Sequence, residues 1–351
     1  MKKILLTGGG TAGHVTPNIA LLPRLRELGF QIHYMGSKNG IELELIKREG
    51  IPYHPISAGK LRRYFDWKNI TDLFRIAAGF FQSLIIMAKL RPHIVFSKGG
   101  FVSCPVVWAA WCLRRPVIIH ESDITPGLAN RLSSPFAEKI CYSFPETGRF
   151  IPSGKGVHTG LPVRKTLLGG DANEGRRLCG FQDDKPVLMV IGGSQGSLVV
   201  NAILRSSLAD LVKTYNICHL CGKGNLGDTL PGYAQFEYVN DELPHLFSLA
   251  DLVISRSGAT TLFELLSLHK PNLLIPLATN ASRGDQILNA ESFAKQGFSR
   301  VLPQNDLTPS TLVSSIDKAF TEREEMRAAM EKSSVGDGVE AVIEVIRGIV
   351  N

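Results

Sequence analysis

The sequence has no unbroken apolar run long enough to cross a bilayer. Its longest apolar stretch, Ile76 to Ala88, is interrupted by Gln82 and Ser83, and it is shorter than the roughly 18 to 20 residues that a membrane-spanning helix needs. The first ten residues, MKKILLTGGG, end in a glycine loop at the place where a secretory signal would have its cleavage region. We therefore expect a strand at the start of the chain, a protein that stays inside the cell, and no segment that crosses a membrane.

Cysteines are few and scattered. The six cysteines of this 351-residue chain lie within apolar runs, which is typical of reduced, buried thiols in the cytosol. Cys218 and Cys221 have the spacing of a metal or redox pair, but the sequence places no second pair of ligands nearby. Because a structural zinc site needs four ligands, we expect neither a metal site nor a disulfide framework.

An acidic residue is missing where a dinucleotide-binding domain would need it. Residues 7–17 read TGGGTAGHVTP, and their glycines match the G-x-G-x-x-G pattern of such domains. Those domains bind the ribose through an Asp or Glu about 20 residues further on, at the end of the second strand. Here that strand ends in HYMG, residues 33–36, and the nearest carboxylate, Glu42, belongs to the next helix. The loop therefore predicts an anion site without a nicotinamide, and we expect no cofactor.

No Asp-x-Asp pair occurs in the chain, so the usual device for holding a metal on a nucleotide diphosphate is absent. If the chain were a sugar-nucleotide enzyme, it would have to stabilise the charge of the leaving group with helix dipoles and arginine, not with a metal. The net charge of +7 is compatible with nucleic acid, an anionic membrane or a phosphorylated substrate as partner. Because aromatic residues do not alternate with the basic ones, we expect no nucleic-acid groove.

Short β-branched runs alternate with amphipathic stretches, and this alternation occurs twice along the chain; one strand of the second half is expected at FEYV, residues 236–239. It predicts an α/β protein with two Rossmann-like, doubly wound parallel-sheet domains. A loop rich in Gly, Ser and Pro at residues 150–162 separates them. We expect residues 1–158 and a C-terminal helix within 336–351 to form the first domain, and residues 159–335 to form the second. The two domains should face each other across a cleft.

Four glycine-bearing turns each join an expected strand to a helix, two in each domain. Ligands of open α/β sheets bind beyond the carboxyl ends of the strands, so these turns predict a ligand with phosphates. Glu264 lies one turn into the helix that Gly258 begins, where it can accept hydrogen bonds from ribose hydroxyls while helix amides hold a diphosphate. The turns are TGGGTAG (7–13), SKGGF (97–101), GGSQG (192–196) and RSGATT (256–261).

Seven segments that span nearly the whole chain resemble the MurG family of glycosyltransferases. They are GGGTAGHVTPN, SKGGFVSCPVVWAAW, HESDITPGLANR, GLPVR, GGSQGS, SRSGATTLFE and SRGDQILNA. The resemblance implies a GT-B fold, no metal, and inverting transfer of N-acetylglucosamine (GlcNAc) from UDP-GlcNAc to the muramoyl 4-hydroxyl of lipid I, a muramoylpentapeptide on a polyprenyl diphosphate. The product would be lipid II, for peptidoglycan synthesis. A UDP-sugar transferase that acts on another lipid, such as diacylglycerol, is the alternative, which the first-domain segments disfavour.

The resemblance also implies roles for individual residues. The chain departs from the usual family pattern at Ala12, Asp123 and Asp285, where glycine, asparagine and glutamine are usual. The acceptor diphosphate would lie at Gly10, Gly99 and Gly100. The residues implied to bind UDP-GlcNAc are Thr11, Ala12, Gly13, Asp123, Arg164, Ser194, Val239, Ala259, Thr260, Thr261, Glu264 and Gln286.

His14 is the candidate general base. The attacking alcohol must lose a proton, and a histidine near neutral pKa can accept it. His14 follows the first glycine loop, and we expect it on the first turn of a helix, pointing into the cleft. A cap or a phosphate ligand is the alternative role. His120 and Glu121 end an expected strand and are the fallback, with Glu121 as the second candidate base.

Aromatic and basic residues gather between residues 60 and 91. Since lipid I lies in the inner leaflet, the enzyme must dock at the cytoplasmic face of the cell membrane as a peripheral protein. Aromatics beside cations suit a helix on an anionic lipid surface. A crossover helix buried against the sheet is the alternative for the same apolar stripe. The residues predicted to meet the membrane are Arg62, Arg63, Trp67, Phe74 and Phe81.

Overall fold

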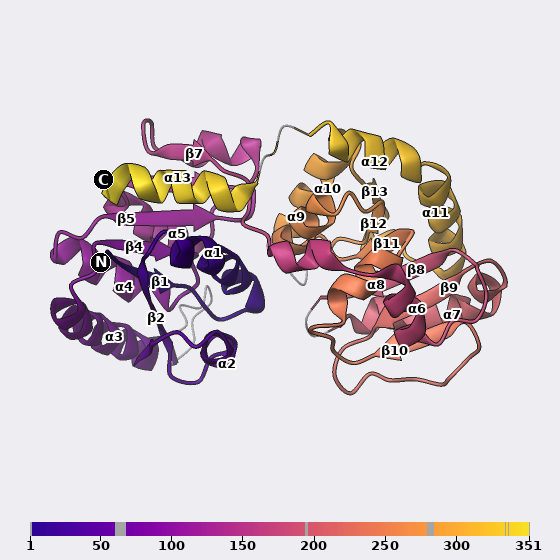
Figure 1. Cartoon of the computed structure of the whole chain (residues 1–351), viewed down its shortest axis with the longest axis horizontal. Helices are drawn as coiled ribbons and strands as arrows, with labels where there is room; N and C mark the ends of the chain where they lie inside the picture. Colours follow the sequence, from indigo (N-terminus) through magenta and orange to yellow (C-terminus); the bar gives the residue numbers. More distant parts are fainter. Residues whose placement is uncertain are drawn as a thin grey trace. The chain divides into compact units, whose positions relative to one another are not determined.

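The chain forms two compact units (Figure 1). This computed structural model describes residues 2–59, 68–193, 196–278, 284–333, 335 and 337–350. One unit comprises Met1–Arg164 and Val335–Asn351, and the other comprises Lys165–Ser334. The sequence places the corresponding boundaries after residues 158 and 335. Each unit is described by itself below.

The sheet of the first unit is parallel throughout its described strands, in the order β3-β2-β1-β4-β5-β6-β7. The order reverses between β1 and β4, which creates the switch point where ligands of open α/β sheets bind. The strands are β1 Lys3–Thr7, β2 Gln31–Ser37, β3 Tyr53–Ile56, β4 Ile94–Ser97, β5 Val117–Glu121, β6 Lys139–Tyr142 and β7 Gly156–His158.

Helices cover both faces of this sheet. Their bounds are η1 Ala12–His14, α1 Thr16–Glu27, α2 Ile41–Arg48, α3 Lys68–Leu90, α4 Ser103–Cys112, α5 Leu128–Ser133, η2 Ser134–Phe136, η3 Pro145–Phe150 and α13 Gly338–Val350, where η marks a 3-10 helix.

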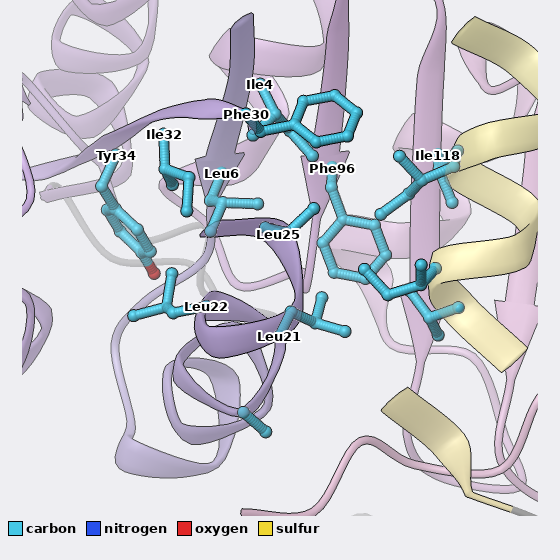
Figure 2. Packing of buried hydrophobic residues seen from close by; sticks show 14 of the residues in the cluster. Ile4, Leu6, Leu21, Leu22, Leu25, Phe30, Ile32, Tyr34, Phe96 and Ile118 are labelled. Carbon is cyan, nitrogen blue, oxygen red and sulfur yellow. The ribbon is translucent and has the colours of Figure 1, made fainter. Parts of the chain in front are cut away.

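Two apolar clusters fill the two faces of the sheet. Leu6 of β1 packs with Leu21 of α1 and Val342 of α13, in the cluster that Figure 2 shows from close by. Because side chains alternate along a strand, Leu5 points to the other face, where it packs with Val106 of α4. The C-terminal helix therefore completes the core of the first unit rather than that of the second.

The second unit repeats this arrangement on a shorter sheet. Its described strands are parallel, in the order β10-β9-β8-β11-β12-β13, so β8 and β11 correspond to β1 and β4. The strands are β8 Val187–Ile191, β9 Asn216–Leu220, β10 Tyr233–Phe236, β11 Leu252–Ser255, β12 Asn272–Leu274 and β13 Arg300–Val301. The helices are η4 Lys165–Gly169, α6 Ala172–Cys179, α7 Leu198–Thr214, α8 Leu243–Leu249, α9 Ala259–Ser267, α10 Asp285–Lys295, η5 Gln304–Asp306, α11 Pro309–Thr321 and α12 Arg323–Glu331.

The expected fold class, α/β with two parallel sheets of Rossmann type, is confirmed, but two local expectations are wrong. His14 lies in the short turn η1, and the first long helix begins only at Thr16. The strand expected at FEYV, residues 236–239, instead covers Tyr233–Phe236, which pairs with Ile217–Leu220. Both stretches are rich in residues that favour strands, so their composition does not choose between them.

Candidate active site

The loops after β1 and β4 lie against each other at the carboxyl edge of the first sheet. Gly9 donates its backbone N–H to the carbonyl of Gly99, with 3.3 Å between nitrogen and oxygen. A Cβ at Gly100 would lie 2.2 Å from the carbonyl oxygen of Gly9, so a side chain has no room there. Gly10 and Gly100 have φ angles of 87° and 84°, which glycine adopts readily. The fold therefore brings together the two loops predicted to hold the acceptor diphosphate.

Glu42 holds the first of these loops. In the sequence it is the nearest carboxylate after the second strand, but it lies too far along to be the ribose-binding acid of a dinucleotide domain. Its Oε2 accepts a hydrogen bond from the amide of Gly10 at 3.2 Å. Its Oε1 accepts from the amide and the hydroxyl of Ser37 at 3.1 and 2.5 Å. A Cβ at Gly9 would lie 2.6 Å from this carboxylate. A buried side-chain anion thus already uses one amide of the loop that was predicted to bind a diphosphate.

His14 is oriented by the backbone of the same loop. Its Nδ1 lies 3.1 Å from the carbonyl oxygen of Gly9 and 3.1 Å from Oγ1 of Thr11. Because the carbonyl can only accept, Nδ1 carries the proton in this arrangement. The lone pair is then on Nε2, which is the nitrogen that a general base needs. The geometry of the imidazole therefore suits the predicted role, which stays a prediction.

His120 is a buried structural histidine. Its Nε2 lies 2.9 Å from the carbonyl oxygen of Gly160, at the start of the GLPVR segment. Burial, with a smaller contribution from Lys98, holds the pKa of His120 well below its usual range. The ring is fully enclosed, so His120 supports the chain at Gly160 rather than reaching a substrate.

Glu121, the fallback base, organises the loop that follows β5. Its carboxylate accepts hydrogen bonds from the amides of Ser122, Asp123 and Gly127 at 2.9, 3.1 and 3.0 Å. Asn130 donates a fourth from its side chain at 2.8 Å. Burial and the nearby Asp123 raise the pKa of Glu121. These contacts favour a positioning role for Glu121. Its hydrogen bond with the amide of Asp123 also fixes the backbone of Asp123.

Lys98, which no sequence pattern singled out, lies beside the glycine loops of the first unit. It follows β4 directly, its side chain is buried, and its Nζ contacts Oγ of Ser122. Burial lowers the pKa of Lys98 to about 8, although the carboxylates of Glu121 and Asp123 act in the opposite direction. The sequence feature that could have pointed to Lys98 is its position between the last residue of a strand and a pair of glycines. A cation thus lies beneath the glycine loops of the first unit.

In the second unit, the loops after β11 and β12 meet the start of α10. Oγ of Ser257 donates to the backbone carbonyl of Gln286 at 2.7 Å, and Oε1 of Gln286 accepts from the amide of Leu277 at 3.0 Å. Gln286 is therefore held where the two loops adjoin. Helix α9 starts at Ala259, directly after Gly258, so its first amides can face an anion at this edge.

The predicted UDP-GlcNAc residues divide between the two units. Glu264 is buried on α9, and Val239 is buried between β10 and α8. Ser194 lies outside the described residues, as do Arg62, Arg63 and Trp67. The first unit carries Thr11, Ala12, Gly13, Asp123 and Arg164; the second carries Val239, Ala259, Thr260, Thr261, Glu264 and Gln286.

Within the described part of the chain, no group of three or more His, Cys, Asp or Glu side chains is placed to hold a metal ion. His219, from the Cys-His-Leu-Cys stretch, has partners at both ring nitrogens. Its Nδ1 lies 2.8 Å from the hydroxyl of Tyr233 and its Nε2 lies 3.0 Å from Oδ1 of Asn201. This histidine therefore belongs to a core network.

Helix α3 exposes a wide apolar face. Its stretch Thr71–Leu90 is long and apolar enough to cross a membrane, by length and composition only. The expectation that the apolar stretch, Ile76 to Ala88, is too short to span a bilayer therefore underestimated the length of this helix. The helix continues past both ends of the apolar run, through Arg75 and Lys89, and packs against α4. One narrow stripe is buried. The large exposed apolar side chains are Leu73, Phe74, Phe81 and Ile85, between 58% and 70% exposed.

The two parallel α/β units, with glycine loops at their carboxyl edges, match the GT-B architecture of solved glycosyltransferases such as MurG. Family profiles agree: the glycosyltransferase family 28 N-terminal domain matches residues 4–142 and its C-terminal domain matches residues 187–345. Among solved structures, MurG of Acinetobacter baumannii matches with a TM-score of 0.77 and 25% identity over 99% of this chain and 100% of that one.

Curated relatives narrow the class to one family. A protein of Clostridium kluyveri is 56% identical over 99% of both chains, and one of Clostridium tetani is 53% identical over 98% of this chain and 97% of its own. Both are named UDP-N-acetylglucosamine--N-acetylmuramyl-(pentapeptide) pyrophosphoryl-undecaprenol N-acetylglucosamine transferase. The chain belongs to the MurG family of glycosyltransferases.

Proposed function

We propose that this chain transfers GlcNAc from UDP-GlcNAc to the muramoyl 4-hydroxyl of lipid I, with inversion from α to β, and so forms lipid II for peptidoglycan synthesis. The observation that carries this function is the full-length similarity to relatives named for that transfer. The same names favour a muramyl pentapeptide acceptor over diacylglycerol. Glycine loops follow strands at the carboxyl edges of both sheets, and backbone amides at such places are suited to phosphorylated substrates.

On the donor side, the second unit holds the nucleotide. The amides of Ala259, Thr260 and Thr261 bind the diphosphate at the start of α9, where the helix dipole favours negative charge. Glu264 accepts hydrogen bonds from the ribose hydroxyls, and the backbone of Val239 faces the uracil. We expect the remaining donor contacts from Gln286 and Asp123 to the sugar and from Arg164 and Ser194 to phosphate. Thr11, Ala12 and Gly13 of the first unit are the other residues expected to bind UDP-GlcNAc.

On the acceptor side, His14 takes the proton of the attacking hydroxyl. The oxygen attacks the anomeric carbon, the bond to the UDP oxygen breaks, and UDP leaves as an anion. Gly9 holds the imidazole through Nδ1, so that Nε2 receives the proton. The leaving diphosphate is stabilised by helix amides and arginine in place of a metal, and no cofactor takes part. The acceptor diphosphate binds at the loops of Gly10, Gly99 and Gly100, beside the Gly10 amide that already donates to Glu42.

The enzyme reaches lipid I at the cytoplasmic face of the cell membrane as a peripheral protein. Phe74 and Phe81 lie on the exposed apolar face of α3, and an apolar helix face beside basic residues suits an anionic bilayer surface. Arg62, Arg63 and Trp67 belong to the same segment of the sequence. The basic charge of the chain serves this surface and its phosphorylated substrates, not nucleic acid.

One assay tests the function directly. Purified full-length protein is incubated with labelled UDP-GlcNAc, EDTA and either a lipid I analogue or diacylglycerol. Label should pass to the lipid I analogue with EDTA present, and the glycosidic bond formed should be β. Transfer to diacylglycerol alone, or transfer abolished by EDTA and restored by a divalent metal, would contradict the proposal.

A further inference from the structure

Each unit buries one cation at the same place in its fold. Lys98 follows β4, which lies between β1 and β5, and Arg256 follows β11, which lies between β8 and β12. Both come directly after a buried serine that ends the strand. Both side chains then reach across to the loops that follow the neighbouring strands. The two residues are structural equivalents in the repeated architecture.

Arg256 joins three strand-end loops of the second unit. Its Nη1 donates to the carbonyl oxygens of Ile275 and Pro276, after β12, at 2.9 and 3.4 Å. Its Nη2 donates to Oγ of Ser197, after β8, at 2.8 Å. The same Oγ accepts the amide of Val200 and so caps the start of α7. The guanidinium therefore lies beneath the edge where the donor nucleotide is proposed to bind.

The two cations differ in how their charge is balanced. Lys98 has the carboxylates of Glu121 and Asp123 in its vicinity. Arg256 is 9% exposed and donates only to neutral oxygens, and within the described residues no carboxylate pairs with it. Burial lowers the pKa of Arg256, with no carboxylate acting against it. A buried charge without a counter-charge is costly, so this position is adapted to an anion that arrives from outside the chain.

We propose that Arg256 is a positioning residue for the donor diphosphate: it fixes the loops after β8, β11 and β12, and its charge is balanced by the diphosphate when the nucleotide binds. This inference rests on the proposed function, because that function supplies the nucleotide. It assigns Arg256 no contact with the reacting atoms. Arg256 acts on the ligand in two ways. It positions Ser197 at the start of α7, and its buried positive charge attracts the diphosphate strongly because little water screens it.

The test compares UDP with uridine, which lacks the diphosphate. Calorimetric titration of the full-length protein gives both affinities. Arg256→Gln keeps an N–H donor for the carbonyl oxygens but removes the charge, and it should weaken UDP binding roughly tenfold or more while changing uridine binding less than about twofold. Arg256→Lys restores the charge and should recover part of the loss. The affinity ratio of UDP to uridine therefore reports the charge.

Lys270 provides a matched control for simple loss of a buried cation. It is a partly enclosed lysine of the same unit that donates to the carbonyl oxygens of Ser248 and Ala250 at 3.2 and 2.8 Å. It lies at the opposite, amino-terminal end of β11 and β12. Lys270→Met should lower the melting temperature and leave the UDP to uridine ratio within about twofold of the wild type.

Two outcomes would overturn the inference. Equal weakening of uridine and UDP by Arg256→Gln would mean that Arg256 only supports the fold. Unchanged affinities for both UDP and uridine in Arg256→Gln would mean that its charge does not act on the diphosphate. If Arg256→Gln does not fold, Arg256→Lys decides. It keeps the charge, so its UDP to uridine ratio should stay near that of the wild type, and a fall of roughly tenfold would contradict the charge role. Wild-type protein that neither binds UDP nor transfers GlcNAc would instead refute the proposed function.

Discussion

The carboxylate of Glu42 accepts a hydrogen bond from the backbone amide of Gly10, with 3.2 Å between Oε2 and the nitrogen. The two residues are 32 positions apart in the sequence, and the contact ties the start of α2 to the loop after β1. Gly9 and Gly40 both lack the side chain that would collide with this carboxylate. The first glycine loop is therefore shaped around an anion that belongs to the protein itself.

Replacing Glu42 should loosen that loop and impair use of the acceptor. Glu42→Gln keeps one oxygen, but its amide nitrogen cannot accept from Gly10. Losing a hydrogen bond to a charged group costs about 1.5 to 3 kcal/mol, so kcat/KM for lipid I should fall roughly tenfold or more, with UDP affinity unchanged. Glu44→Gln, on the exposed side of the same helix, is the control. Wild-type kinetics in Glu42→Gln would show that the loop does not depend on this contact.

Replacing His14 should slow the chemical step and leave nucleotide binding intact. Loss of a general base lowers turnover by roughly 10² to 10⁴, so His14→Ala should show a kcat reduced by that factor and a UDP affinity near that of the wild type. Thr11→Val removes only one of the two contacts at Nδ1 and should have a smaller effect. Near-normal turnover on lipid I by His14→Ala would exclude His14 as the base.

Burial of Lys98 should make stability depend on pH. The folded pKa of about 8 lies below the usual 10.5, so between these values the unfolded chain holds a proton that the folded chain has lost. Stability therefore rises with pH in that window. The free energy of unfolding of the wild type minus that of Lys98→Met should therefore increase by about 2 kcal/mol between pH 7.5 and pH 9.5.

Tryptophan fluorescence during urea unfolding can measure this gain, because Trp67, Trp108 and Trp111 all belong to the first unit. Lys213→Met, at an exposed lysine of the second unit, should show no comparable gain in this signal. A difference between wild type and Lys98→Met that stays flat from pH 7.5 to 9.5 would contradict the expected loss of the proton.

Negative charge on the outer face of α3 should weaken membrane binding. Phe81 is 62% exposed, so Phe81→Glu should fold normally while its carboxylate opposes insertion into anionic lipid. Binding to phosphatidylglycerol vesicles, measured by sedimentation, should fall several-fold, and transfer to a soluble lipid I analogue should be retained. Leu168→Glu, at a similarly exposed leucine of the second unit, should bind vesicles like the wild type. Equal loss in both variants would remove α3 as the docking face.

Much of the fold was predictable because its signals are local. Alternating strand and helix patterns and the glycine turns identify two parallel-sheet domains. The start of α9 at Ala259, with Glu264 one turn further on, follows from the same kind of pattern. The bounds of β10 were not predictable, since YAQFEYV is strand-like along its length and the pairing with Ile217–Leu220 selects Tyr233–Phe236. The length of α3 was missed because charged residues at its ends continue the helix.

The sequence by itself determined which turns carry glycine, where helix amides can meet an anion, and that a histidine follows the first loop, because these depend on residues adjacent in the chain. Only the tertiary structure decided which charged side chains support those turns. Arg256 reaches Ser197 across 59 positions, and Lys98 reaches Ser122 from a neighbouring strand. Burial and charge balance depend on what the parallel sheet places side by side, and no local pattern encodes that.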